Sequence, residues 1–149
     1  MKNIIAIACL IVPMSLFAQP NNTGNKFTER QHMITLTLKT SATEKGVYYR
    51  YIPFQFKTHE ITWDKVDSAY VREYSPVHEY GGWGFRGSRK YGNAINLNGD
   101  MGLQLVFKNG KRLLIGTQKP EEFKGFLISL QNQGIVKTRN EIVKKEIRN

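Results

Sequence analysis

The sequence predicts a small, mainly β domain: a closed or split barrel of about seven short antiparallel strands, with one C-terminal helix that plugs its open end. Two observations carry this prediction. Short runs rich in apolar and β-branched residues recur at regular intervals between Met33 and Gly116, separated by turn residues. A single amphipathic stretch then follows Pro120. At 149 residues the chain has room for one such domain with tails.

The predicted strands follow one another closely along the chain. They are residues 33–38, 47–52, 55–63, 69–74, 83–86, 94–97, 102–108 and 111–116. The first alternates apolar and polar residues, as a half-buried strand does. The last two flank Asn109-Gly110, a dipeptide typical of tight hairpin turns. Trp63 and Trp83 are expected to pack in the core or at a corner of the barrel.

One helix is expected after Pro120, a residue suited to the first helical turn. Glu121 and Glu122 complement the positive end of the helix dipole, and Gly134 is suited to the C-cap. Apolar residues fall at i, i+3, i+4 and i+7, namely Phe123, Phe126, Leu127 and Leu130. This stripe predicts that one face of the helix is buried against the strands.

The chain begins with a segment typical of export. Lys2 precedes an apolar run from Ile4 to Ala18, which is short for a bilayer span and suits the core of a signal peptide. Residues 1–20 are therefore predicted to be a signal peptide or an N-terminal membrane anchor. A cleaved chain would be periplasmic or secreted, and an uncleaved one membrane-anchored. The only cysteine, Cys9, lies in this leader. The folded domain is expected over residues 27–135, followed by a charged tail at 136–149.

Two segments, GGWGFR at 81–86 and IGTQKPEE at 115–122, together resemble the bacterial pleckstrin-homology-like (PH-like) domain family. The similarity covers roughly residues 27–130. It implies two near-orthogonal antiparallel sheets, a C-terminal helix and a frequent membrane setting, and it brings no catalytic residues. The chain departs from the family after residues 27–31. Many members have a hydrophobic hairpin there, whereas this chain runs directly into residues 33–38.

The charge pattern points to anionic partners. The net charge is +10, which favours acidic lipid head groups or acidic proteins. Two basic clusters are candidate anion-binding residues: Arg86, Arg89, Lys90 and Tyr91 between glycines, and Lys108, Lys111 and Arg112 around the predicted turn. Loop guanidinium and amide groups can bind phosphate. The alternative is that both clusters are solvated, with turn lysines that only deter strand pairing.

Other function classes fit the sequence poorly. Glycines at 82, 84 and 87 satisfy G-x-G-x-x-G, but no buried strand precedes them and no helix follows, so a dinucleotide site is not expected. His32, His59 and His78 are far apart, so neither a metal nor a cofactor is expected. Ser68 lacks the context of a hydrolase nucleophile, and no nucleic-acid motif is present. The sequence thus predicts a non-enzymatic binding or scaffold module. A protein-interaction module using a barrel edge or helix groove is the alternative, and a hydrolase is a third class.

Overall fold

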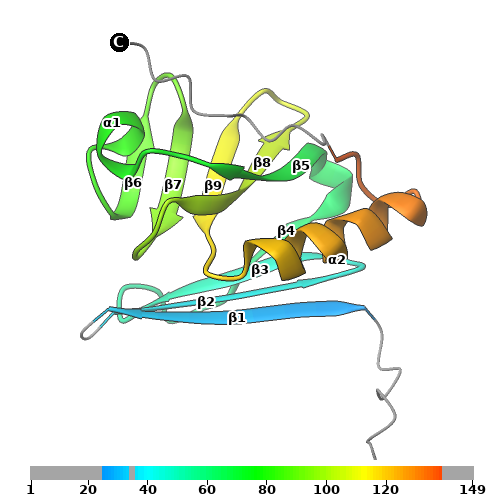
Figure 1. Ribbon diagram of the computed structural model, residues 1–149, viewed down its shortest axis with the longest axis horizontal. Helices are drawn as coiled ribbons and strands as arrows, with labels where there is room; N and C mark the ends of the chain where they lie inside the picture. Colours follow the sequence, from blue (N-terminus) through cyan, green and yellow to red (C-terminus); the bar gives the residue numbers. More distant parts are fainter. Residues whose placement is uncertain (1–24, 34–35, 139–149) are drawn as a thin grey trace, which may run out of the picture.

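The computed structural model describes residues 25–33 and 36–138. In this part of the chain two β-sheets pack across a common core, and the C-terminal helix lies beside them (Figure 1). The prediction of a mainly β protein with a C-terminal helix is confirmed. The leader at 1–20, with Cys9, and the tail from residue 139 onward lie outside the described residues.

The first sheet has four antiparallel strands in sequential order. They are β1 (Lys26–Met33), β2 (Leu36–Thr43), β3 (Gly46–Ile52) and β4 (His59–Thr62). Alternate residues of β2, such as Leu38 and Ala42, are buried against the core, and Val47 and Tyr51 do the same from β3. The strand expected at 55–63 is shorter than predicted, because only the four residues of β4 pair with β3.

The prediction of a single strand at 33–38 is wrong, because β1 ends at Met33 and β2 begins at Leu36. Strand β1 was missed because its buried positions do not follow an apolar pattern. Two polar residues, Glu29 and Gln31, are buried together with Phe27. Thr117 donates its hydroxyl to Glu29 at 2.6 Å, and the Gln31 side-chain amide donates to the Gly116 carbonyl. These bonds give the Glu29 carboxylate and the Gln31 amide nitrogen partners at inward positions that an alternating pattern would fill with apolar residues, while the Gln31 side-chain oxygen has no hydrogen-bond partner among the described residues.

The second sheet has five strands in the order β5-β8-β9-β7-β6. A 3-10 turn, Trp63–Lys65, leads into β5 (Val66–Glu73), which is followed by the short helix α1 (Pro76–Tyr80). The remaining strands are β6 (Gly84–Ser88), β7 (Gly92–Asn96), β8 (Met101–Phe107) and β9 (Arg112–Gly116). The hairpin expected at Asn109-Gly110 is confirmed, since β8 and β9 pair antiparallel around it.

The sheet arrangement corrects the barrel prediction in three respects. The described residues contain nine strands rather than about seven, and β7 pairs with β9 in parallel. No closed barrel is seen in residues 25–33 and 36–138, where each strand pairs only within its own sheet. The sequence signals missed the parallel pair because a local pattern indicates a strand and not its neighbour.

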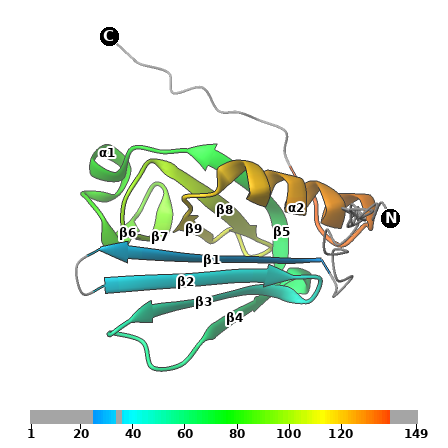
Figure 2. The same ribbon diagram turned by 60° about the horizontal axis from the view of Figure 1, so that its bottom comes forward.

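Helix α2 (Pro120–Asn132) packs against β1, β5 and β8, at the open side between the sheets (Figure 2). The predicted stripe is confirmed, since Phe123, Phe126, Leu127 and Leu130 are all buried. The ring of Phe123 stacks on Phe27 of β1 with centroids 3.9 Å apart. The helix therefore joins the first strand of the domain to the second sheet.

A glycine turn ends this helix and returns the chain to the core. Gly134 has φ +72°, a left-handed conformation that favours glycine, and the next amide, of Ile135, donates to the Leu130 carbonyl at 3.0 Å. Val136 is buried, and the Lys137 carbonyl accepts a hydrogen bond from Ala69 of β5 at 2.9 Å. The packed core therefore includes residues beyond 135.

Candidate functional site

Strand register decides where the basic residues gather. Asn93 of β7 lies beside Leu113 of β9, and the two strands run in the same direction. The turn that precedes β7 and the turn that precedes β9 therefore lie at the same end of the second sheet. Figure 1 shows both turns along the upper edge of that sheet. The close approach needs a glycine at position 92, where a Cβ atom would collide with the Arg112 carbonyl.

Six cationic residues line this end of the sheet, and we call them the basic rim. They are Lys65 before β5, Lys108 after β8, Lys111 and Arg112 at the start of β9, and Arg89 and Lys90 in the β6–β7 turn. Lys65 adjoins the group because its carbonyl accepts a hydrogen bond from the Lys108 amide at 3.1 Å. With neighbouring strands about 4.8 Å apart, the rim extends over roughly 20 Å.

The structure brings together six of the seven predicted anion-binding residues. Arg89, Lys90, Lys108, Lys111 and Arg112 belong to the rim and are exposed. Tyr91 is half-buried beneath it, with the Lys90 ammonium 5.2 Å from its ring centroid.

Arg86 is the exception, because it lies within strand β6 rather than in a loop. Its Nε donates to the Trp83 carbonyl at 3.0 Å. Lys65 belongs to the rim but was not among the predicted residues. No local signal distinguishes Lys65, since only the pairing of β5 with β8 brings it to this end.

Few acidic groups balance the rim. The described ion pairs join Arg72 to Glu79, Lys119 to Glu122 and Lys124 to Glu121, and none involves a rim residue. Asp64, next to Lys65 in the chain, is a carboxylate whose pKa is affected by rim charges. A hydrogen bond from Thr62 lowers the pKa of Asp64, and the charges of Lys65 and Lys108 lower it further. The rim therefore presents an excess of positive charge to solvent.

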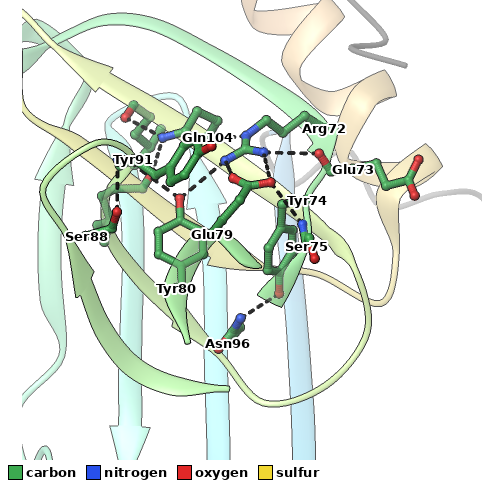
Figure 3. A network of polar contacts seen from close by, with 12 residues as sticks. Arg72, Glu73, Tyr74, Ser75, Glu79, Tyr80, Ser88, Tyr91, Asn96 and Gln104 are labelled. Carbon is green, nitrogen blue, oxygen red and sulfur yellow. Dashed lines mark hydrogen bonds and ion pairs between the residues drawn. The ribbon is translucent and has the colours of Figure 1, made fainter. Parts of the chain in front are cut away.

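A polar network holds the β6–β7 turn in place (Figure 3). Its centre is the Arg72 guanidinium of β5, which contacts Glu79 of α1 through two hydrogen bonds of 2.7 and 3.2 Å. The side chains of this pair are only 12% and 15% exposed. Arg72 also donates to Tyr80 at 3.3 Å, and the Tyr80 hydroxyl donates to the Tyr91 carbonyl at 3.5 Å. The network thus connects β5 through α1 to the rim.

The same network is hydrogen-bonded to strands β8 and β9 of the second sheet. Arg72 Nε donates to the Gln104 side-chain oxygen at 3.0 Å, and the Gln104 amide donates to the carbonyls of Leu105 and Leu113, each at 3.3 Å. Glu79 additionally accepts the Ser75 amide at 2.9 Å. Because each buried polar group in this set has a partner, the network can fix one conformation.

Two tyrosines of this region are kept in the neutral form by burial. Burial raises the pKa of Tyr74 to about 12, although a hydrogen bond from Asn96 acts in the opposite direction. Burial also raises the pKa of Tyr80, while the nearby Arg72 charge lowers it. Both phenols therefore remain protonated at neutral pH, and the Tyr80 hydroxyl keeps the proton that it donates to Tyr91.

A second surface feature, the aromatic pocket, lies at the opposite end of β6. It is a depression of about 550 Å³ lined by Tyr51, Phe54, Gln55, Trp83, Gly84, Phe85 and Arg86. Both tryptophans were predicted to pack in the core or at a corner; Trp63 is buried, whereas Trp83 is 43% exposed and is not part of the buried core. Phe54 and Phe85 are 71% and 59% exposed. Grouped exposed aromatic residues of this kind are typical of interaction surfaces.

Other kinds of site have little support in the described residues. Within residues 25–33 and 36–138, no group of three or more His, Cys, Asp or Glu side chains could hold a metal ion. The glycine motif at 82–87 leads into strand β6 rather than a helix. No helix in the described part is long and apolar enough to span a membrane.

Comparison of the chain with models of known protein families and with curated proteins gives no significant match.

Proposed function

We propose that this protein is a non-catalytic module that binds anionic membrane surfaces through the basic rim. The observation that carries this proposal is the convergence of six cations at one end of the five-stranded sheet, none of them in an ion pair with a described carboxylate. A basic residue near an anionic membrane contributes about 1 kcal/mol of binding free energy. Six such residues at one end of a rigid sheet provide enough attraction for a reversible association.

The sequence supports the setting of this proposal. Residues 1–20 have the pattern of a signal peptide or membrane anchor, which would place the domain at the bacterial envelope. The resemblance of residues 81–86 and 115–122 to the bacterial PH-like family also favours a binding role near membranes. The parallel pairing of β7 and β9 departs from the two antiparallel sheets of that family. The proposal therefore depends on the rim and not on the family assignment.

Removal of three rim charges should weaken binding to anionic vesicles about 100-fold, because each charge contributes about 1 kcal/mol. The variant is Arg89→Ser/Lys111→Ser/Arg112→Ser, measured by co-sedimentation with vesicles containing phosphatidylserine. The wild-type protein should bind at low salt and dissociate at high salt, since screening weakens exposed charges.

The matched control removes three cations that lie away from the rim: Lys57→Ser/Lys119→Ser/Lys124→Ser. This variant has the same net charge as the rim variant and should keep most of the binding. Equal losses in the two variants would show that only net charge matters. No binding of the wild-type protein at low salt would reject the membrane proposal.

A second candidate function is favoured by the aromatic pocket. Strand β6 is at the edge of its sheet, with exposed Phe85 beside the pocket. An extended apolar peptide from another protein could pair with such an edge and place a side chain in the pocket. On this interpretation the module binds protein rather than lipid.

A photo-crosslinking residue at position 85 should capture one defined partner in cells if this candidate is correct. Position 128 is the control, because Ile128 of α2 is also apolar and 48% exposed but lies on another surface. A partner captured from position 85 and lost on Trp83→Ala would support peptide binding. The same products from both positions would indicate nonspecific contact and reject this candidate.

A further inference from the structure

The outer face of the first sheet carries a second positive surface, distinct from the basic rim. Helix α2 and the second sheet lie on the other side of β1–β4, and no described element covers the outer face (Figure 1). Register places Arg30 of β1 opposite Lys39 of β2, and Lys39 opposite Arg50 of β3. Three cations therefore form one row across three strands, which we call the cationic row.

These side chains point away from the core, as the burial of their neighbours shows. Arg30 lies between buried Glu29 and Gln31, and Lys39 lies between buried Leu38 and Thr40. Successive side chains of a strand point to opposite faces. The row therefore faces solvent.

Such a row is unfavourable in the absence of a ligand. Directly opposite residues in a sheet have Cβ atoms about 5 Å apart, and like charges there are destabilising. None of the three cations forms an ion pair with a described residue. Glu60 is on the same face, but it accepts a hydrogen bond from the Tyr48 hydroxyl at 2.8 Å. The three cations of the row therefore lie side by side without a direct ion-pair partner among the described residues.

A depression beside the row provides further donors. It has a volume of about 270 Å³. Its lining includes the cations Lys26, Lys39 and Arg50 together with the hydroxyl residues Thr28, Ser41 and Tyr48. The Nε atom of Arg50, one of the lining residues, is buried and has no hydrogen-bond partner among the described residues. A buried donor without a partner is costly unless a ligand satisfies it. The depression is thus lined by three cations and several hydroxyl groups, and one of these cations carries a buried donor without an acceptor.

We propose that this depression and the cationic row bind a soluble phosphorylated small molecule with at least two negative charges. Guanidinium groups bind phosphate oxygens through paired hydrogen bonds, and hydroxyl groups donate to the remaining oxygens. The volume accommodates a phosphate group and part of the molecule that carries it. The second charged group would lie along the row toward Arg30. The recessed Arg50 Nε favours a small molecule over the head groups of a flat membrane.

The test uses the full chain and inorganic pyrophosphate as the probe, at constant ionic strength. Pyrophosphate should bind with a measurable Kd by calorimetry and should raise Tm with increasing concentration, since a ligand of the native state stabilises it. Arg50→Gln should weaken binding at least tenfold. The rim variant Arg89→Ser/Lys111→Ser/Arg112→Ser should bind pyrophosphate as the wild-type protein does, so this test is separate from that of the rim.

Lys39→Gln provides a second test, in which stability and pyrophosphate binding should change in opposite directions. The central cation has a like charge on each side, so its removal should raise the Tm of the ligand-free protein by about 1–4 °C while weakening pyrophosphate binding. A merely structural lysine would not show both effects. Absence of pyrophosphate binding by the wild-type protein, or unchanged binding by Arg50→Gln, would overturn the proposal. Arg50-dependent binding to phosphatidic acid vesicles alone would also overturn it, in favour of a lipid head group.

Discussion

Phe123→Ala should lower the free energy of unfolding by about 3–5 kcal/mol, because truncation of a buried phenylalanine leaves a cavity. Phe123 is fully buried, and its ring stacks on Phe27 and contacts Phe126. It thus joins helix α2 to the first strand of the domain. A small domain has a total stability of about 5–15 kcal/mol. Chemical denaturation followed by tryptophan fluorescence should show a large fall in the midpoint.

Lys124→Ala is the matched control on the same helix. Its ammonium contacts Glu121 at 2.6 Å, but that glutamate side chain is 80% exposed, and such surface pairs contribute little. The midpoint of this variant should change little. Similar midpoints for Phe123→Ala and Lys124→Ala would contradict the packing of α2 on the core.

The elements that the sequence predicted well are those whose pattern is local. The stripe of α2 has a period of 3.6 residues, and all four of its apolar residues are buried. The hairpin of β8 and β9 was predicted from Asn109-Gly110, because that dipeptide favours the backbone conformation of the turn. Both signals depend on residues close together in the chain, so they could be recognised without knowledge of the neighbours.

The elements that were missed depend on distant partners. Strand β1 has Glu29 and Gln31 at buried positions, and their partners Thr117 and Gly116 lie more than 80 residues away in the chain. Helix α1 has five residues and is too short to show a helical period. Local patterns cannot indicate β1, since the contacts that stabilise its polar residues come from distant parts of the chain.

The candidate surfaces were likewise predicted where they depend on local sequence and missed where they depend on strand pairing. Six of the seven predicted basic and aromatic residues do gather at one end of the second sheet, but only the parallel pairing of β7 with β9 brings the two clusters together. The cationic row was not predicted, because strand β1 was not recognised. The row is defined by the register of β1 with β2 and of β2 with β3. Arg86 was grouped with the residues of the basic loop although it also ended the predicted strand at 83–86, and the structure places it within strand β6.

Glu79→Ala should also lower the free energy of unfolding by about 3–5 kcal/mol, for a different reason. The substitution leaves the Arg72 guanidinium largely buried without its carboxylate, and an unpaired buried charge is strongly destabilising. The Ser75 amide loses its acceptor as well. Because α1 connects through Tyr80 to the β6–β7 turn, the variant should also bind anionic vesicles more weakly than the wild-type protein, although no rim residue is changed.

The double variant Arg72→Met/Glu79→Leu separates charge burial from simple loss of contacts. Replacement of both members of a buried ion pair by apolar residues of similar size is often neutral or stabilising. The double variant should therefore recover most of the stability lost in Glu79→Ala, as measured by chemical denaturation. It should not recover vesicle binding fully, because Arg72 also orients Tyr80 and Gln104 through hydrogen bonds that methionine cannot donate. A double variant as unstable as Glu79→Ala would show that lost contacts, rather than the unpaired charge, cause the instability.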